Sequence, residues 1–308
     1  FNNVGQLGLG DTTSRSSPVQ VGSSSWTVSS AGNNFTQAIT SAGLLFAWGN
    51  NANGILGLPL VAYTPQDSNF TNSSWASISS ANNFTAGIRT DGSLWMWGVN
   101  TYGQLGQNNV TTRSSPVQVG SSSWTMVSAG MQHTTAIRVD GTLWAWGRNN
   151  VGQLGQTTVT LRSSPVQVGS SSWTVTSSGN SYTVAIRSGG SLFAWGLNSS
   201  GQLGNASTVN QSSPVLIGSS SWTAIDAGGT SSFGSYCSGI GGYGGQTDSP
   251  YEGGIGGSAT GGDINIPGGG GEMAHGADRE GGGGSSFWHK SGSNHHYTSS
   301  DSSMWNTH

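Results

Sequence analysis

WGRNNVGQLGQTTVTLRSSPV, from Trp146 to Val166, is the stretch of sequence that decides the fold. Its elements return along the chain at a fixed interval of 49 residues, in the order Trp-Gly, Gly-Gln-Leu-Gly and Ser-Pro-Val. A constant period of this size is the signature of a repeat architecture, in which each unit packs on its neighbours. The tryptophan of the Trp-Gly pair stands at Trp48, Trp97, Trp146 and Trp195.

A second series of tryptophans has the same period. Of the 13 tryptophans, 11 lie at positions that recur from unit to unit. The low charge, 7% of residues, and the 52 glycines would by themselves indicate disorder. Large aromatic side chains at a fixed spacing instead require a packed interior, so we expect the repeats to be folded and these rings to form the core. The second series is Trp26, Trp75, Trp124, Trp173 and Trp222.

One period contains four short apolar or β-branched segments and no helical pattern. Asp140-Gly141 separates two of them and predicts a hairpin with a type I′ turn, in which both central residues have positive φ. Proline before the last segment suits a strand start or a sheet edge. The four segments are Trp124–Gly130, His133–Arg138, Leu143–Trp146 and Ser164–Val168.

Units of four short strands cannot bury a core alone and must pack on one another. The sequence therefore predicts an all-β fold, a β-propeller of four-stranded blades of about 49 residues. A β-solenoid is the competing arrangement, but its coils are usually shorter and the hairpin signal here is antiparallel. The period covers residues 1–228, or about 4.7 units, so the propeller is incomplete within this chain.

The ordered motif within each unit, Asp-Gly-x-Leu-x-x-Trp-Gly-x-Asn-x-x-Gly-Gln-Leu-Gly followed by Ser-Pro-Val, resembles the repeat of the regulator of chromosome condensation family. The resemblance implies a propeller, commonly of about seven blades. We therefore expect either further blades before Phe1, which stands inside a repeat, or a smaller ring. The second unit departs most from the pattern, because Pro65 is out of register within Leu58–Asn72.

After Gly228 the repeat stops, and we predict a separate glycine-rich segment over residues 229–308. One interpretation is a flexible tail, as for other Gly/Ser-rich sequences. The other is a packed tip, because glycine doublets let extended chains approach closely. The segment Gly253–Gly271 is similar to glycine-rich domains near the ends of bacteriophage tail-fibre and adhesin proteins.

Composition excludes several classes of function. Residues 1–228 hold seven arginines and five acids, and residues 229–308 hold two basic residues and seven acids, with no basic run in either. The sequence therefore lacks the basic patch that nucleic-acid binding requires. Cys237 is the only cysteine, which rules out an internal disulfide or a cysteine metal cluster. No apolar run reaches the roughly 18 residues of a membrane span, so membrane insertion is not expected.

The sequence offers no catalytic constellation, and we expect no enzyme activity, cofactor or metal site. The glycine loops open no helix and are interpreted as blade turns. His133 occupies a position that other units give to an aromatic ring, so it should be packed in the core. Asp91 and Asp140 are explained by hairpin turns, and no pair of carboxylates is placed for two-carboxylate catalysis.

Recognition is expected where the repeat does not dictate the residue. Within the propeller these positions are Arg148, Thr157–Leu161 and their equivalents. In the glycine-rich segment, exposed aromatic and imidazole side chains on a scaffold of small residues have the composition of binding loops. The candidate receptor-contact residues there are Tyr243, Tyr251, Trp288, His289, His295, His296 and Trp305.

Together these features suggest a non-enzymatic structural protein of a bacteriophage virion, a tail-fibre or tail-tip adhesin that binds a host-surface glycan or protein. It would act outside the cell, beside other virion proteins, in several copies that supply avidity. The alternative is a secreted or cell-surface propeller of a bacterium. The guanine-nucleotide exchange role that the family resemblance implies is more remote, because the chain lacks a basic arm.

Overall fold

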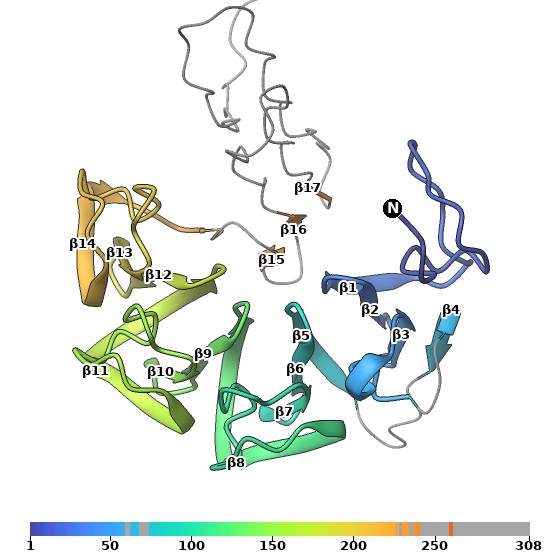
Figure 1. Cartoon of the computed structure of the whole chain (residues 1–308), viewed down its shortest axis with the longest axis horizontal. Coiled ribbons are helices and arrows are strands. Elements are labelled where there is room, and N and C mark those ends of the chain that lie inside the picture. Colours follow the sequence, from blue (N-terminus) through green and yellow to red (C-terminus); the bar gives the residue numbers. More distant parts are fainter. Residues whose placement is uncertain are drawn as a thin grey trace, which may run out of the picture.

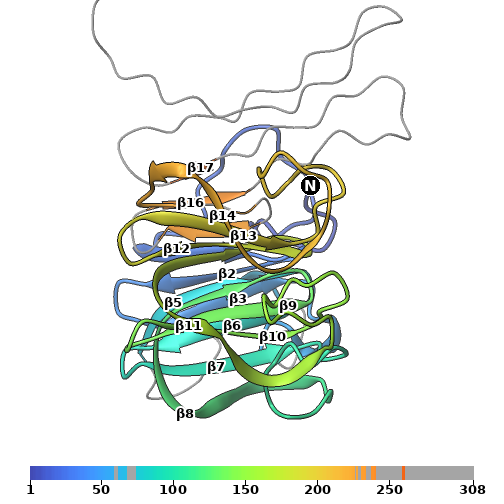
Figure 2. The ribbon, with the colours of Figure 1, turned by 90° about the vertical axis from the view of Figure 1, so that its left-hand side faces the viewer.

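The computed structural model describes residues 1–58, 62–67, 74–225 and 227, and the backbone of 230–233, 237–240 and 259–260. Its described residues form β-strands and one short 3-10 helix, η1 (Ala52–Gly54). Antiparallel sheets are arranged as blades along an arc, with their strands running from one face of the arc to the other (Figures 1 and 2). The predicted propeller of four-stranded blades is confirmed, and the β-solenoid is excluded.

Four blades can be followed. Blade 1 contains β1 (Trp26–Ala31), β2 (Phe35–Thr40), β3 (Leu45–Gly49) and β4 (Ala62–Asp67). Blade 2 contains β5 (Trp75–Ser80), β6 (Phe84–Arg89), β7 (Ser93–Gly98) and the first half of β8 (Arg113–Ala129). Blade 3 contains the second half of β8, β9 (His133–Arg138), β10 (Thr142–Gly147) and the first half of β11 (Arg162–Ser178). Blade 4 contains the second half of β11, β12 (Tyr182–Arg187), β13 (Ser191–Gly196) and β14 (Gln211–Ser221).

A smaller antiparallel sheet follows the blades in the sequence. It consists of β15 (Thr230–Phe233), β16 (Cys237–Ile240) and β17 (Ala259–Thr260). Its first strand lies near β1 and β5, in the open side of the arc (Figure 1).

The strands that join the blades are longer than the sequence pattern suggested. We predicted separate short strands, but β8 and β11 each run for 17 residues. The first half of each is the outer strand of one blade, and the second half is the inner strand of the next. Gly120 and Gly169, with φ of 57° and 60°, lie between the two halves. Glycine allows this change of direction because it adopts positive φ without steric cost.

Blade 1 is joined differently to its neighbour. The strands β5 to β14 form one hydrogen-bonded series, whereas β1 to β4 form a sheet of their own. The short outer strand β4 contains Pro65, and within the described part of the chain it pairs with β3 alone. Proline cannot donate to a ladder and is tolerated on such an edge. The irregular register of the second unit therefore coincides with the break between the two sheets.

The hairpin turns are also not of the predicted type. Between β9 and β10 the amide of Gly141 donates to the carbonyl of Arg138 at 2.9 Å, and Gly141 has a φ of 81°. Asp140 is not among the residues with positive φ, as a type I′ turn would require. The loop is the three-residue kind, a turn followed by one left-handed glycine. The prediction of a hairpin is confirmed, and the type I′ assignment is wrong.

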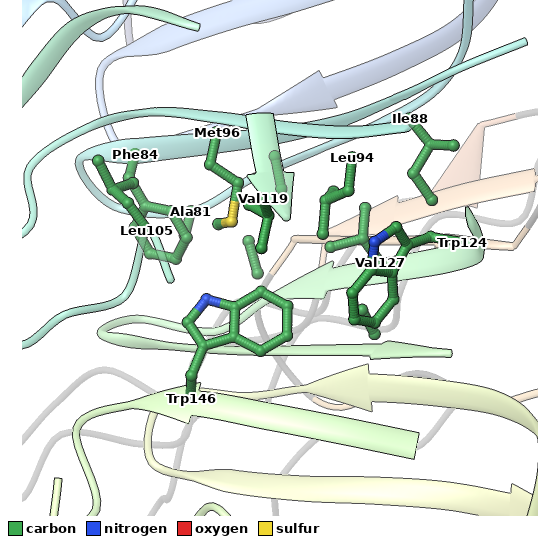
Figure 3. Close-up of a cluster of buried hydrophobic side chains, with 13 residues drawn as sticks. Ala81, Phe84, Ile88, Leu94, Met96, Leu105, Val119, Trp124, Val127 and Trp146 are labelled. Carbon is green, nitrogen blue, oxygen red and sulfur yellow. The ribbon is translucent and has the colours of Figure 1, made fainter. Parts of the chain in front are cut away.

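Each contact between consecutive blades, called a seam below, is built from the repeated motif. Trp146 of blade 3 is fully buried against blade 2, where it packs with Phe84, Leu105 and Val119 (Figure 3). Its Nε1 donates to the carbonyl oxygen of Gln104 at 2.8 Å. The Trp-Gly pair of one blade thus packs against the Gly-Gln-Leu-Gly loop of the preceding unit. Equivalent bonds join Trp48 to Gln6, Trp97 to Ile55 and Trp195 to Gln153.

The glycines of this loop leave room for the indole. A Cβ built on Gly106 would lie 2.9 Å from Nε1 of Trp146, and one on Gly155 would lie 2.7 Å from Nε1 of Trp195. Side chains therefore cannot be added there without displacing the ring. The tryptophan and the glycine stand 40 residues apart in the sequence, yet the indole fits at the seam because glycine has no side chain.

Inner strands are linked by a second periodic bond. The hydroxyl of Ser79 accepts the amide of Ala129 at 3.0 Å, and the hydroxyl of Ser128 accepts the amide of Ser178 at 2.9 Å. The same bond joins Ser177 to the amide of Ala227 at 3.2 Å. The periodic contacts therefore reach Ala227, next to the predicted boundary at Gly228.

Trp222 is an exception to the predicted aromatic core. Its side chain is 42% exposed, whereas Trp75, Trp124 and Trp173 are buried. Each of those three packs against the Trp-Gly tryptophan of its own blade, with ring centroids 5.8–5.9 Å apart. One period after Trp195 the sequence has Gly244, so Trp222 lacks that partner.

Candidate functional site

The candidate contact residues of the glycine-rich segment all lie outside the described residues, so the structure does not place them. They are Tyr243, Tyr251, Trp288, His289, His295, His296 and Trp305. The search for a site therefore concerns the two faces of the blades.

His133 is a core residue, as predicted. Its side chain is fully buried, and Nε2 lies 3.0 Å from the hydroxyl of Thr183 in the next blade. Nδ1 has no hydrogen-bond partner. Burial lowers the pKa of His133 to about 3, because the charged imidazolium would be desolvated. The neutral ring takes the place that Phe35, Phe84 and Tyr182 have in the other blades.

The turn face is formed by the short β2–β3-type turns, at residues 41–44, 90–92, 139–141 and 188–190. Asp140 accepts bonds there from the amide and the hydroxyl of Thr142, at 2.9 and 2.6 Å. Asp91 does the same with Ser93. The bonds to these side-chain hydroxyls are the main reason that the pKa of each carboxyl is lowered. Both aspartates thus have the turn-forming role that the sequence predicted.

Arginine–aromatic stacks are the most regular feature of the turn face. Cζ of Arg138 lies 3.6 Å from the ring centroid of Trp144 and 5.0 Å from that of Trp124. Arg89 and Arg187 make the equivalent stacks in blades 2 and 4. Burial lowers the pKa of Arg138, but guanidinium remains charged at neutral pH. The sequence analysis missed these stacks, although the 49-residue recurrence of arginine was a visible signal.

Charges on the turn face compensate one another. The described part of this face carries three arginines at the ends of inner hairpins and three aspartates, and two of the arginines, Arg89 and Arg138, interact with an aspartate of their own turn. The aspartates are Asp67, Asp91 and Asp140. Because the stacks recur in three blades and their charges are balanced, they are explained by blade stability.

The loop face, on the opposite side, carries the long connections of residues 50–58, 99–112, 148–161 and 197–210, and the tight turns 81–83, 130–132 and 179–181. A buried asparagine fixes the last three of these long loops. Nδ2 of Asn149 donates to the carbonyls of Thr158 and Thr160 at 2.8 and 3.0 Å, and Oδ1 accepts the amide of Leu154. Asn100 and Asn198 repeat the arrangement. The loop tips therefore rest on a rigid base.

Apolar side chains are exposed at these tips. Val159 is 58% exposed, and Val110, Leu161 and Val209 are also largely exposed. Val159 and Leu161 belong to the stretch Thr157–Leu161, where we expected recognition. Exposed apolar residues held on ordered loops are typical of contact surfaces for other molecules.

The charge of the loop face is unbalanced. Among the described residues it carries four arginines and one aspartate, which leaves three positive charges. The single aspartate, Asp11, forms a salt bridge with Arg15 at 2.5 Å. The remaining arginines are Arg113, Arg148 and Arg162.

Two kinds of site receive no support from the described residues. Nowhere in that part of the chain do three or more His, Cys, Asp or Glu side chains gather as metal ligands. The same residues include no helix with the length and apolarity needed to cross a membrane.

The architecture is shared with solved structures. Human WBSCR16 superimposes with a TM-score of 0.63 and 20% identity over 70% of this chain and 61% of that chain. Prp20p from Saccharomyces cerevisiae superimposes with a TM-score of 0.58 and 18% identity over 65% of this chain and 52% of that chain. At this identity the likeness concerns the fold. The chain spans about half to three fifths of the length of these proteins.

Family models identify the repeats directly. No curated protein matches the chain. The model of the regulator of chromosome condensation (RCC1) repeat matches five consecutive segments, residues 1–39, 42–88, 91–137, 140–186 and 189–234. These segments cover most of the chain and follow the period of the blades. The chain belongs to the regulator of chromosome condensation repeat family.

Proposed function

We propose that this chain is a non-enzymatic binding module that recognises a partner with its loop face. The observation that carries the proposal is the combination, on one face, of exposed aliphatic side chains with arginines that lack acidic neighbours. The opposite face has balanced charges and carries its aromatic rings in intrablade stacks. A surface of mixed apolar and cationic character fits a protein partner better than a small substrate.

The relatives support a protein as partner. One solved structure with this fold is described together with the binding of Prp20p to Gsp1p and histones, and another is a complex of Kap60 with yeast RCC1 (Prp20). These partners belong to those proteins. What we transfer is the partner class: a propeller of this family that holds another protein.

The setting we propose is the surface of a bacteriophage virion, where the module would be part of a tail fibre or tail tip that attaches to a host receptor. This part of the proposal rests on the sequence of Gly253–Gly271, which resembles phage fibre domains, and on the low charge of the chain. Neighbouring fibre or baseplate genes would support it. A signal peptide in the full gene would instead favour a secreted or cell-surface bacterial propeller.

The chain supplies its own replacements for testing this proposal. Val159→Thr takes the residue that stands one period later, at Thr208, and Leu161→Thr takes the residue at Thr112. Both remove an apolar tip with little disturbance of the loop. Val139→Thr is the matched control, because Val139 is 65% exposed on the turn face and its equivalent is Thr90.

The measurement is adsorption of purified particles to host cells. Particles with Val159→Thr and Leu161→Thr should adsorb several-fold more slowly, and particles with Val139→Thr should behave like the wild type. Normal adsorption by particles that lack the protein would refute the adhesin role. If the loop-face variants and Val139→Thr adsorb equally well, and only particles that lack the protein fail to adsorb, the loop face is not the contact surface.

A further inference from the structure

The seams between blades share one backbone but differ in two side chains on the loop face. In the four loops that contain the glutamine of Gly-Gln-Leu-Gly, the backbone amide two residues earlier donates to its side-chain Oε1, as Tyr102 does to Gln104 at 2.8 Å and Val151 to Gln153 at 3.0 Å. Position 102 and its equivalents therefore occupy the same place in these four loops. The same holds for position 148, whose amide bonds to the carbonyl of Gln132 at 2.9 Å.

Among the seams that the structure describes, only the one between blades 2 and 3 combines an aromatic ring with a cation at these positions. Cζ of Arg148 lies 5.0 Å from the ring centroid of Tyr102, across the seam. The equivalent pair is Val151 with Leu197 at the next seam, Asn53 with Val99 at the preceding seam, and Val4 with Asn50 before that. An arrangement that departs from the repeat at one seam is not needed to build seams.

Two further residues beside Arg148 also depart from the repeat. Nη1 of Arg148 donates to Oε1 of Gln132 at 2.5 Å. Met131, next to Gln132, is 39% exposed. The other blades have asparagine where Met131 stands, and asparagine or serine where Gln132 stands. The off-repeat cluster, defined as Tyr102, Met131, Gln132 and Arg148, thus joins four such substitutions at one point of the loop face.

The cluster presents a guanidinium whose orientation is fixed before any ligand arrives. Tyr102 supports its face and Gln132 holds one nitrogen, while among the described residues no acidic side chain neutralises it. Arg148 is half-exposed, so its remaining donors can be reached from solvent. A planar fork of donors held in this way matches a carboxylate. Met131 adds an adaptable apolar contact.

We propose that the off-repeat cluster is a binding site for an acidic peptide segment, in which a carboxylate pairs with Arg148 and a neighbouring apolar side chain packs on Met131 and Tyr102. The three uncompensated charges of the loop face complement such a segment. The loop that begins at Arg148 also carries the exposed Val159 and Leu161, which extend the apolar surface. A polyanion such as nucleic acid would require more positive charge than this face has. This inference rests on the proposed function and specifies the partner.

Peptides selected from a random linear library on the immobilised full chain are the probe. Arg148→Leu and Tyr102→Val install the residues that stand at Leu197 and Val151, so the next seam demonstrates that the fold accepts them. Arg162→Gln removes the same charge from the same face, and its equivalent is Gln211. Unchanged melting temperatures verify that all variants are folded.

Selected peptides should be enriched in Asp or Glu next to apolar residues. Arg148→Leu should weaken their binding about tenfold or more, as for loss of a charge-assisted hydrogen-bonded pair. Tyr102→Val should weaken it several-fold. Arg162→Gln should weaken it less than Arg148→Leu, because Tyr102 and Gln132 orient the guanidinium of Arg148 and not that of Arg162. Absence of acidic enrichment, or equal losses for Arg148→Leu and Arg162→Gln, would overturn the proposal.

The remaining outcomes separate this inference from the proposed function. Peptides that lose binding to Val159→Thr and Leu161→Thr but not to Arg148→Leu would leave the loop face as the contact and overturn the carboxylate site. Peptides insensitive to every loop-face variant would overturn both. If the chain self-associates and Arg148→Leu abolishes this, the cluster binds a second copy and the peptide proposal is overturned. If the chain binds dextran sulfate in an Arg148-dependent way but binds no peptide, the cluster binds a polyanion and the peptide proposal is again overturned.

Discussion

Single residues in this protein reveal the difference between what the repeat requires and what it tolerates. Blade 3 places His133 where the other three blades place Phe35, Phe84 and Tyr182. The imidazole is accommodated only in its neutral form, with Nε2 bonded to Thr183 and Nδ1 unpaired. The site is therefore an aromatic core position that happens to hold a titratable ring.

The substitution His133→Phe should change the pH dependence of stability. The pKa of the histidine falls from 6.5 to about 3 on folding, so the unfolded chain binds a proton that the folded chain excludes. The stability associated with neutral His133 is thus fully present above pH 6.5 and is lost as the pH falls toward 3, by up to about 1.4 kcal/mol per pH unit.

Urea denaturation of both proteins at pH 7 and pH 4.5 measures this effect. The free energies of unfolding should be similar at pH 7 and should differ by about 3 kcal/mol at pH 4.5, in favour of His133→Phe. The contributions of the carboxylates are common to both proteins and cancel in the comparison. Parallel pH curves for the two proteins would show that His133 is not excluded from protonation in the folded state.

Loop positions with positive φ allow a similar test at the scale of one element. Thr157 has a φ of 61°, which is unfavourable for a β-branched residue, and its equivalent Asn108 has a φ of 55°. Both amides donate to the outer strand of the next blade, to Ser212 and Ser163 at 2.7 Å. The backbone conformation is thus imposed by the contact between blades and not by the residue type.

Thr157→Asn should stabilise the protein by about 0.5–1 kcal/mol, because asparagine tolerates the left-handed conformation. The reverse substitution, Asn108→Thr, should destabilise it by a similar amount. Thermal denaturation of both variants measures the two shifts. If both variants moved the melting temperature in the same direction, backbone strain at these positions could not be the cause.

Two glycines, Gly155 in a loop and Gly169 within β11, permit a sharper comparison. Gly155 and Gly169 both have positive φ, but a Cβ on Gly155 would meet the Trp195 indole at 2.7 Å, whereas one on Gly169 would meet nothing within 4 Å. Gly169→Ala should cost about 1 kcal/mol from backbone strain alone. Gly155→Ala should cost about 2–4 kcal/mol, since it also displaces the tryptophan.

Equilibrium unfolding in urea, followed by tryptophan fluorescence, distinguishes the two glycine variants. Equal losses of stability would mean that the close approach of Gly155 to Trp195 contributes nothing. A larger loss for Gly155→Ala, accompanied by a change in the native fluorescence, supports the seam as described.

At the scale of the whole molecule, the sequence predicted the blades well because their construction is periodic. Trp146 and its equivalents reveal the core, and Asp140-Gly141 reveals the hairpin, since each signal lies within one unit. The continuity of β8 and β11 could not be read in this way, because it depends on how one blade is turned relative to the next. The exposure of Trp222 likewise depends on its partner position, Gly244, where the repeat has stopped.

The candidate site was predicted only in part. Arg148 and Thr157–Leu161 stood out because they vary among nearly identical units. Two contacts between separate loops are not indicated by any spacing in the sequence. Tyr102 stacks on Arg148 across a seam, and Gln132 accepts a hydrogen bond from the guanidinium. The difference in charge between the two faces could not be predicted either, because it depends on which face each strand end reaches.

The central claim is that repeated residues build the blades while off-repeat residues of the loop face bind the partner. Hydrogen exchange of the full chain, with and without a selected peptide bound, tests it most directly. The account predicts slower exchange in residues 99–112, 130–132 and 148–161, and unchanged exchange in the turns at 90–92, 139–141 and 188–190. Protection confined to those turns, with the long loops unaffected, would contradict it.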